Sequence, residues 1–295
     1  MATLRELKGR IGSVASSEKI TGAMKMISSA KMHKAEGSLR RLVPFKNQIQ
    51  TIMANLISSD AQFSSPLTSP RPEIKNYIIV VWGSDDGLCG AYNVNILKGL
   101  TAKIKDIRSN YNPAIVTIVT VGKKMYKAAS KLNDIPGIKV EKAPIDSKAD
   151  GMPVDDFMRS LQMQFAKSEA DRVDALYMHF KTAGRQILTH VQLLPILPET
   201  FTPAGVKVQT GRPYLFEPDA NAIFNAVLPM FLLSTMQEIF TENRASEQAA
   251  RVMAMQSAND NAKTLLEELN LEYNKLRQQS ITSELLDIVG GQSRE

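Results

Sequence analysis

A glycine-rich loop that carries two carboxylates and a thiol is the segment best suited to chemistry in this sequence. It spans Gly83–Gly90 (GSDDGLCG), after an apolar run and before a helical pattern, where α/β folds bind phosphates. Its glycines do not follow the G-x-G-x-x-G spacing, and the chain contains no G-x-x-x-x-G-K-[ST] motif. The two carboxylates would also repel a phosphate. We interpret the loop as a tight strand-to-helix turn, with a nucleotide site as the alternative.

The other candidate catalytic groups are one cysteine, three histidines and an aspartate pair. Cys89 needs a histidine base to act as a nucleophile, but His179 and His190 lie on predicted core strands, where packing explains them. Asp85 and Asp86 are adjacent, which disfavours an acid–base pair that converges on one substrate atom. A single cysteine excludes an intrachain disulfide and a zinc site with two thiolates. We expect no catalytic, cofactor-binding or metal-binding residue.

Alternating strand and helix patterns predict the fold that holds the loop. Apolar runs at 77–82 and 114–121 are typical of buried parallel strands. Further strands are expected at 138–140, 173–180 and 187–194, and helices at 93–107, 123–132 and 152–166. The alternation predicts a doubly wound, Rossmann-like α/β domain over residues 72–212.

The N-terminal segment 1–58 predicts one long helix. Its apolar side chains recur at three- and four-residue spacing. Thr3 and Glu6 form a capping-box pattern at its start. The spacing continues past Gly37 and Pro44, so we expect these residues to bend or weaken the helix without ending it.

The C-terminal segment 217–291 predicts a second, longer helix. Asp219 is a candidate N-cap, and Pro229 is expected to kink the helix about ten residues later. Gly290 and Gly291 are the expected C-terminal stop. Roughly 70 helical residues would extend about 105 Å.

Helices of this length must bury their apolar stripes, and the simplest partner for each is the other. We therefore predict a long antiparallel two-helix coiled coil with the α/β domain inserted between its helices. Its seam is expected to be rich in small residues and methionine, including Met26, Ser28 and Met32 opposite Ala249 and Met253. Residues 1–58 hold ten basic and three acidic side chains, and 217–295 hold six and twelve. The charges indicate either two solvated faces or pairing of the two helices.

Composition excludes several classes of protein. Hydrophobic residues make up 43% and charged residues 22% of 295, with a net charge of +6, which is typical of a globular chain. Pro229 and polar residues interrupt the longest apolar run, 226–240, and the start MATLRELKGR has no apolar signal region. We expect a soluble, intracellular protein. With 6% aromatic residues and Phe45 as the one aromatic of the basic N-terminal helix, an acidic protein partner is favoured over nucleic acid.

Several motifs closely resemble the gamma subunit of the F-type ATP synthase, the central shaft of its F1 sector. They are KITGAMKMI at 19–27, SD and GLCG within 84–90, ASEQAARVMAM at 245–255, ANDNA at 258–262 and EYNKLRQQSITSELLDIVGG at 272–291. The resemblance covers the whole chain. Three departures stand out: Asp86 replaces a usual basic residue, Gly22 a usual lysine and Gln292 a usual small residue.

The resemblance implies a non-catalytic rotary shaft. In this family the two long helices turn inside a ring of three alpha and three beta subunits, and the α/β domain touches the epsilon subunit and the membrane c-ring. Ion flow through the c-ring turns the shaft, and rotation cycles the beta subunits through ATP synthesis or hydrolysis. It also implies no cofactor and membrane association only through the complex. The start at Met1 without a presequence favours a place on the cytoplasmic face of a bacterial inner membrane, with a mature mitochondrial chain as the alternative.

The resemblance also assigns partner contacts residue by residue. It implies contacts with the beta subunits at Met24, Lys25, Arg277 and Gln278, and an apolar bearing tip at Ile281, Leu285 and Ile288. The chloroplast dithiol switch is excluded, because Cys89 has no second cysteine to pair with. Two other functions remain as alternatives: a coiled-coil adaptor with an α/β head outside any ATPase, and an enzyme with its site at the Gly83–Gly90 loop.

Overall fold

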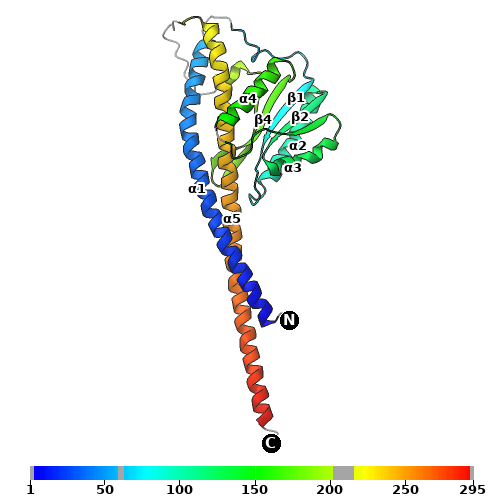
Figure 1. Cartoon of the computed structure of the whole chain (residues 1–295), viewed down its shortest axis with the longest axis vertical. Helices are drawn as coiled ribbons and strands as arrows, with labels where there is room; N and C mark the ends of the chain where they lie inside the picture. Colours follow the sequence, from blue (N-terminus) through cyan, green and yellow to red (C-terminus); the bar gives the residue numbers. More distant parts are fainter. Residues whose placement is uncertain (1–2, 59–62, 150, 202–215, 293–295) are drawn as a thin grey trace. The chain divides into compact units, whose positions relative to one another are not determined.

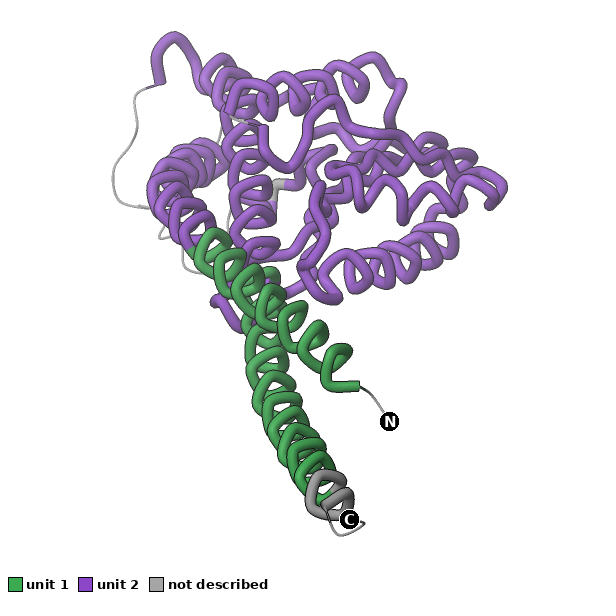
Figure 2. Tube along the Cα trace, turned by 60° about the horizontal axis from the view of Figure 1, so that its bottom comes forward, with its two compact units in different colours: residues 1–29, 251–295 green, residues 30–250 purple. Residues whose placement is uncertain are grey.

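The computed structural model describes residues 3–58, 63–149, 151–201 and 216–292, with the side chains of Pro198 and of residues 287–292 outside the described set. The chain divides into two compact units, shown in Figure 2. The first unit combines residues 1–29 with 251–295, and the second comprises residues 30–250. The predicted end of the α/β domain at residue 212 lies outside the described residues.

A five-stranded sheet forms the centre of the second unit. Its strands are β1 (Asn76–Trp82), β2 (Ile115–Val121), β3 (Ile138–Lys142), β4 (Arg172–Thr182) and β5 (Arg185–Leu194), in the spatial order β3-β2-β1-β4-β5. The first four are parallel, while β5 pairs with β4 as an antiparallel hairpin. The predicted α/β fold is confirmed, with an antiparallel edge strand added to its parallel sheet.

Helices cover both faces of this sheet (Figure 1). On one face, α2 (Tyr92–Tyr111) and α3 (Lys123–Ala129) pack on Tyr77, Ile79 and Val81 of β1. On the other face, Ile78, Val80 and Trp82 contact a core built by α4 (Gly151–Ala166) and parts of the two long helices. The strand side chains alternate between these two cores because neighbouring residues of a strand point to opposite faces.

The two long helices are α1 (Leu4–Ile57) and α5 (Ala220–Gln292), each of which contributes to both units. The capping box is confirmed: the Thr3 N–H donates to Glu6 Oε2 (2.8 Å) and the Glu6 N–H donates to Thr3 Oγ1 (3.3 Å). Asp219 is confirmed as the N-cap of α5, because its Oδ1 accepts the Ala222 N–H at 2.9 Å.

The predicted C-terminal stop of the second long helix is wrong. The helix α5 continues through Gly290 and Gly291 to Gln292, so these glycines do not stop it. Glycine disfavours a helix by only about 1 kcal/mol relative to alanine, which lowers helix propensity without forcing the chain to turn.

The N-terminal part of α5 is apolar enough to resemble a membrane span. An 18-residue window within Ala220–Leu286 has a mean hydropathy of 1.4, and half of that window is buried inside the fold. The buried part includes Phe224, Leu228, Phe231 and Leu232, which belong to the core beside the sheet. The core role accounts for this hydropathy, since the core helix of a globular unit is apolar on its buried side.

Two glycines let the loop after β1 lie against the start of α3. Gly122 has φ +99°, and a Cβ there would lie 2.7 Å from the backbone of Ser84. At Gly83 a Cβ would lie 2.4 Å from Met125 Cβ. Neither position therefore has room for a side chain.

The Gly122→Ala variant is expected to lower the free energy of unfolding of the second unit by about 2–3 kcal/mol, through backbone strain and the clash with Ser84. Urea unfolding followed by the fluorescence of Trp82, the one tryptophan of the chain, measures this loss. Gly184→Ala is the matched control, because a Cβ there meets nothing within 4 Å, and it should change stability by less than about 0.5 kcal/mol. Equal stability of the two variants would contradict the conclusion that Gly122 has no room for a side chain.

Candidate functional site

The polar side chains of the Gly83–Gly90 loop form hydrogen bonds and an ion pair with neighbouring parts of the fold. Asp85, 8% exposed, accepts the Lys123 N–H at 2.8 Å and the Ser147 N–H at 2.7 Å. Burial opposes ionisation of Asp85, but these backbone hydrogen bonds outweigh it and lower the pKa of the carboxyl. Asp86, the departure noted in the sequence, forms an ion pair with Lys148 at 3.0 Å. The two carboxylates therefore serve separate structural contacts.

The cysteine of this loop is also placed as a structural group. Cys89 is buried, and its Sγ lies 3.7 Å from Ser84 Oγ and 3.6 Å from Asn93 Nδ2. Asn243 of α5 donates from Nδ2 to Gly83 O at 3.2 Å and accepts the Tyr92 hydroxyl at 2.7 Å. These bonds join the end of β1 and the start of α2 to α5, which supports the interpretation as a strand-to-helix turn.

The histidines on β4 and β5 meet carboxylates instead of the cysteine. His190 Nε2 lies 2.6 Å from Asp174 Oδ2. Asp174 is fully buried and also accepts hydrogen bonds from the Tyr77 hydroxyl and, at 3.1 Å, from Arg172 Nε. Burial beside Asp174 raises the pKa of Tyr77. This cluster links β1, β4 and β5 inside the sheet.

His179 makes the second of these contacts, with its Nδ1 2.8 Å from Glu242 Oε2 of α5. Burial raises the pKa of Glu242, and His179 opposes that rise. Within the ranges that the structure describes, no three His, Cys, Asp or Glu side chains form a metal-binding group. The candidate catalytic groups are thus distributed among separate packing contacts.

The other candidate site is the surface of the helix pair in the first unit (Figure 2). Leu7 of α1 is fully buried and Leu269 of α5 is 3% exposed. Ten residues before Leu269 along α5, Asn259 Nδ2 donates to Glu18 O at 2.7 Å and to Thr21 Oγ1 at 3.3 Å. Because Asn259 meets residues 18–21 and the helices run in opposite directions, the antiparallel pair has a defined register.

Gly22, which replaces the lysine usual in the family, lies beside Asn259. A Cβ on Gly22 would come within 3.3 Å of Asn259 Nδ2, which is a tight contact. Gly22 therefore faces α5 within the helix pair. The missing side chain at Gly22 leaves room for the amide group of Asn259.

Much of the polar surface of this part of α1 is already hydrogen-bonded within the helix. The side-chain hydroxyls of Ser13, Ser16, Ser17 and Thr21 each donate to the carbonyl four residues earlier, at 2.9–3.1 Å. Among the described side chains of residues 3–29 and 252–286, no ion pair joins the two helices. Charge pairing appears in the second unit instead, between Lys46 and Glu238.

Large apolar side chains lie exposed on the first unit. On α1, Ile20, Met26 and Ile27 are 59%, 70% and 56% exposed. On α5, Met253 and Leu271 are 53% and 72% exposed. Met26 and Met253 were expected in the seam between the helices, and this expectation is wrong because both are exposed. Ser28, also expected in the seam, is buried. These exposed apolar side chains are available for contact with a protein partner.

The residues assigned by resemblance all belong to the first unit but form two groups. Met24 and Lys25 are half-buried on α1, near the level of Asn259. Arg277 and Gln278 are exposed on α5, 18 and 19 residues beyond Asn259, which is about 28 Å along a helix. The structure does not bring the two groups together.

The predicted apolar tip is exposed where its side chains are described. Ile281 is 49% and Leu285 57% exposed, and Leu286 beside them is 66% exposed. The side chain of Ile288 lies outside the described residues. The sequence analysis did not single out Leu271, although an apolar residue on an otherwise polar helix turn was the available signal.

The chain matches known proteins along its whole length. The family model described as ATP synthase matches residues 3–293. The ATP synthase gamma chain of Phocaeicola vulgatus is 38% identical over 296 residues, with 99% of each chain covered. The gamma chain of Bacteroides fragilis is 39% identical over 294 residues with the same coverage, and that of Chlorobaculum parvum is 34% identical, covering 99% of this chain and 98% of its own.

Solved structures share the fold. A chain in the OSCP/F1/c-ring structure of the Euglena gracilis mitochondrial ATP synthase aligns with a TM-score of 0.64 and 20% identity, covering 98% of this chain and 93% of its own. A chain in the central stalk/c-ring structure of the Tetrahymena thermophila mitochondrial ATP synthase gives 0.56 and 22%, covering 81% and 99%. Taken with the full-length relatives, these results establish that the chain belongs to the ATP synthase gamma chain family.

Proposed function

We propose that this chain is the central rotary shaft of an F1Fo ATP synthase and couples ion flow through the c-ring to conformational cycling of the catalytic beta subunits. The exposed apolar surface of the first unit carries this proposal. Ile20, Met26, Ile27 and Leu271 are more than half exposed, which is costly for a chain that stays alone in water. A ring of subunits around the helix pair would cover them.

The polar surface supports rotation against that ring. Because the hydroxyls of Ser13, Ser16, Ser17 and Thr21 donate within α1, they make few directional demands on a partner. A shaft works by presenting different faces to equivalent subunits, and each affinity change is a difference in interaction free energy between two conformations. Few fixed hydrogen bonds keep the barriers between angular positions low.

The finer features of the proposal follow the family. The partners are three alpha and three beta subunits, an epsilon subunit and the c-ring, and the chain itself is non-catalytic. Asp85, Cys89 and Asp174 each make contacts that stabilise the fold, which supports the proposal that the chain is non-catalytic. The complex is placed on the cytoplasmic face of a bacterial inner membrane, where this chain is peripheral.

Native mass spectrometry of the chain co-expressed with the alpha and beta subunits of its host tests the shaft role. The expected result is a three-three-one assembly with Mg-ATPase activity that is absent when this chain is omitted. A folded chain that fails to associate would instead support a coiled-coil adaptor. Circular dichroism of the isolated chain provides the folding control.

The Arg277→Ala variant is expected to lower coupled ATP synthesis about tenfold, because a charged hydrogen bond contributes about 1.5–3 kcal/mol. The measurement is ATP synthesis by reconstituted vesicles, alongside native mass spectrometry of the assembly. Lys263→Ala on the same helix is the matched control, since Lys263 is exposed and has no assigned contact. Unchanged synthesis and assembly in Arg277→Ala would remove Arg277 from the contact surface.

The Lys25→Glu variant is expected to lower the number of ions pumped per ATP hydrolysed, because charge reversal turns an attraction to an acidic partner into repulsion. Proton pumping by inverted vesicles is compared with ATPase activity in the same preparation. The control is Lys19→Glu, the same reversal at an exposed position of α1. An unchanged pumping yield in Lys25→Glu would count against the assigned role.

A further inference from the structure

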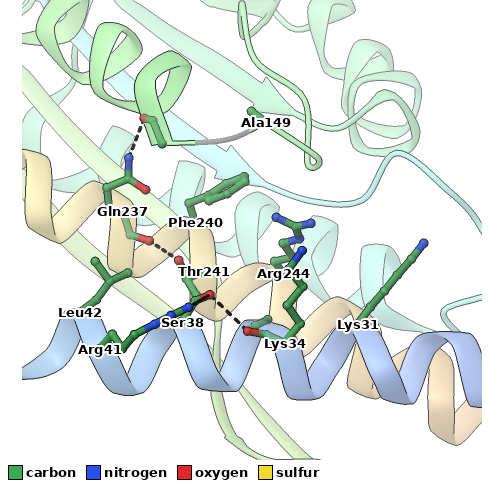
Figure 3. A pocket seen from close by; sticks show the side chains of 12 residues that line it. Lys31, Lys34, Ser38, Arg41, Leu42, Ala149, Gln237, Phe240, Thr241 and Arg244 are labelled. Atoms are coloured by element: carbon green, nitrogen blue, oxygen red, sulfur yellow. Dashed lines mark hydrogen bonds between the residues drawn. The ribbon is translucent and has the colours of Figure 1, made fainter.

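A basic pocket in the second unit lies between α1, α5 and the start of α4 (Figure 3). It encloses about 340 Å³ and is lined by Lys31, Lys34 and Arg41 of α1 and Arg244 of α5. In Figure 3 the side chains of Lys31, Lys34 and Arg244 extend from the two helices toward the same side of the pocket. Neither the rotary role nor the partner contacts proposed above use these residues.

The pocket concentrates positive charge that no described side chain neutralises through an ion pair. Among the residues that the structure describes, the lining holds four cations and no carboxylate. In the part of the chain that the structure describes, none of the four forms an ion pair. Acidic side chains of the same helices are engaged elsewhere: Glu36 with His33, Glu238 with Lys46 and Glu242 with His179. Four like charges around one cavity repel one another, and a bound anion would relieve that repulsion.

The neutral lining restricts the kind of anion. Ser38 Oγ donates to Lys34 O at 3.2 Å, Thr241 Oγ1 donates to Gln237 O at 2.7 Å, and Gln237 Nε2 donates to Gly151 O at 2.7 Å. These donors are therefore used within the fold and do not select a sugar. Phe240, the one aromatic residue among the described lining residues, is only 5% exposed and offers no face for a base to stack on.

We propose that this pocket binds a compact polyphosphate anion, with inorganic pyrophosphate as the smallest representative. Arginine binds phosphate oxygens through its planar fork, and the lysines contribute as point charges. A pyrophosphate presents several anionic oxygens, which suits cations that approach from two helices. The phosphates carry the recognition, so a nucleoside attached to them adds nothing.

Calorimetric titration of the purified full-length chain with inorganic pyrophosphate tests the site. Arg244→Gln and Lys34→Gln are each expected to weaken binding about tenfold, and the double variant further, since charged hydrogen bonds dominate the affinity. Arg244→Lys keeps the charge and should retain part of the binding. Lys127→Gln, the same charge change at an exposed lysine of α3, is the matched control and should bind as the wild type does.

Chemical protection locates the ligand. Pyrophosphate should slow acetylation of Lys31 and Lys34 by a lysine-reactive reagent, as mapped by mass spectrometry, while Lys127 reacts at an unchanged rate. Equal protection of all three lysines would overturn the proposal. The absence of heat with pyrophosphate at about 5 mM would also overturn it, because the binding free energy would then be weaker than about −3 kcal/mol.

Two further ligands decide the source of the phosphate. ATP should bind no more tightly than inorganic tripolyphosphate, and stronger binding of ATP would contradict recognition through phosphates alone. Vesicles with anionic headgroups are compared with neutral vesicles in a sedimentation assay. Binding to anionic vesicles that is lost in Arg244→Gln, with no binding of pyrophosphate, would overturn the soluble ligand in favour of a membrane surface.

Discussion

The α/β unit depends above all on the burial of one apolar helix face against the sheet. Between Phe224 and Phe240, α5 supplies seven members of the core cluster on that face. Two ring contacts illustrate the fit: Trp82 with Phe240 at 5.8 Å and Phe201 with Phe231 at 4.9 Å between centroids. Each fully buried apolar side chain contributes about 1.5–3 kcal/mol. The sheet, the glycine loop and the basic pocket all rely on this helix being in place.

The same helix then changes its role along its length. At Ala245, Ser246 and Ala249 the side chains are small and fully buried, and Ser246 Oγ donates to Met178 O of β4 at 2.8 Å. From residue 251 onward the helix belongs to the first unit, and Leu271 is 72% exposed. One helix thus serves first as a core element and then as a contact surface, with no turn that separates the two roles.

Local patterns in the sequence predicted much of this fold. The caps at Thr3 and Asp219 and the buried strand after residue 76 follow from nearest neighbours along the chain, where spacing is informative. The antiparallel edge strand β5 was not predicted as such, because an apolar run does not reveal the direction of its partner. The exposure of Met26 and Met253 was also missed, since helical spacing defines a stripe but not what covers it. The glycine pair 290–291 shows that propensity alone does not end a helix.

Sequence spacing did not predict the side-chain contacts between segments that are far apart in the chain. Nothing in the sequence links Asn243 to Tyr92, or Asp174 to His190, because these pairs meet only once the sheet and helices have assembled. The basic pocket was equally hidden: Lys34 and Arg244 are far apart in the chain and gain a shared role only from the packing of α1 on α5. Such clusters form only through tertiary packing, so sequence patterns do not reveal them.

The hydrogen bond from Asn259 to the carbonyl of Glu18 has an evolutionary consequence. Its acceptor is a main-chain atom, which every amino acid supplies at that position. The side chain at residue 18 can therefore be replaced without loss of this bond that sets the register of the helix pair. The outer surface of α1 is free to diverge with its partners while Asn259 keeps the two helices aligned.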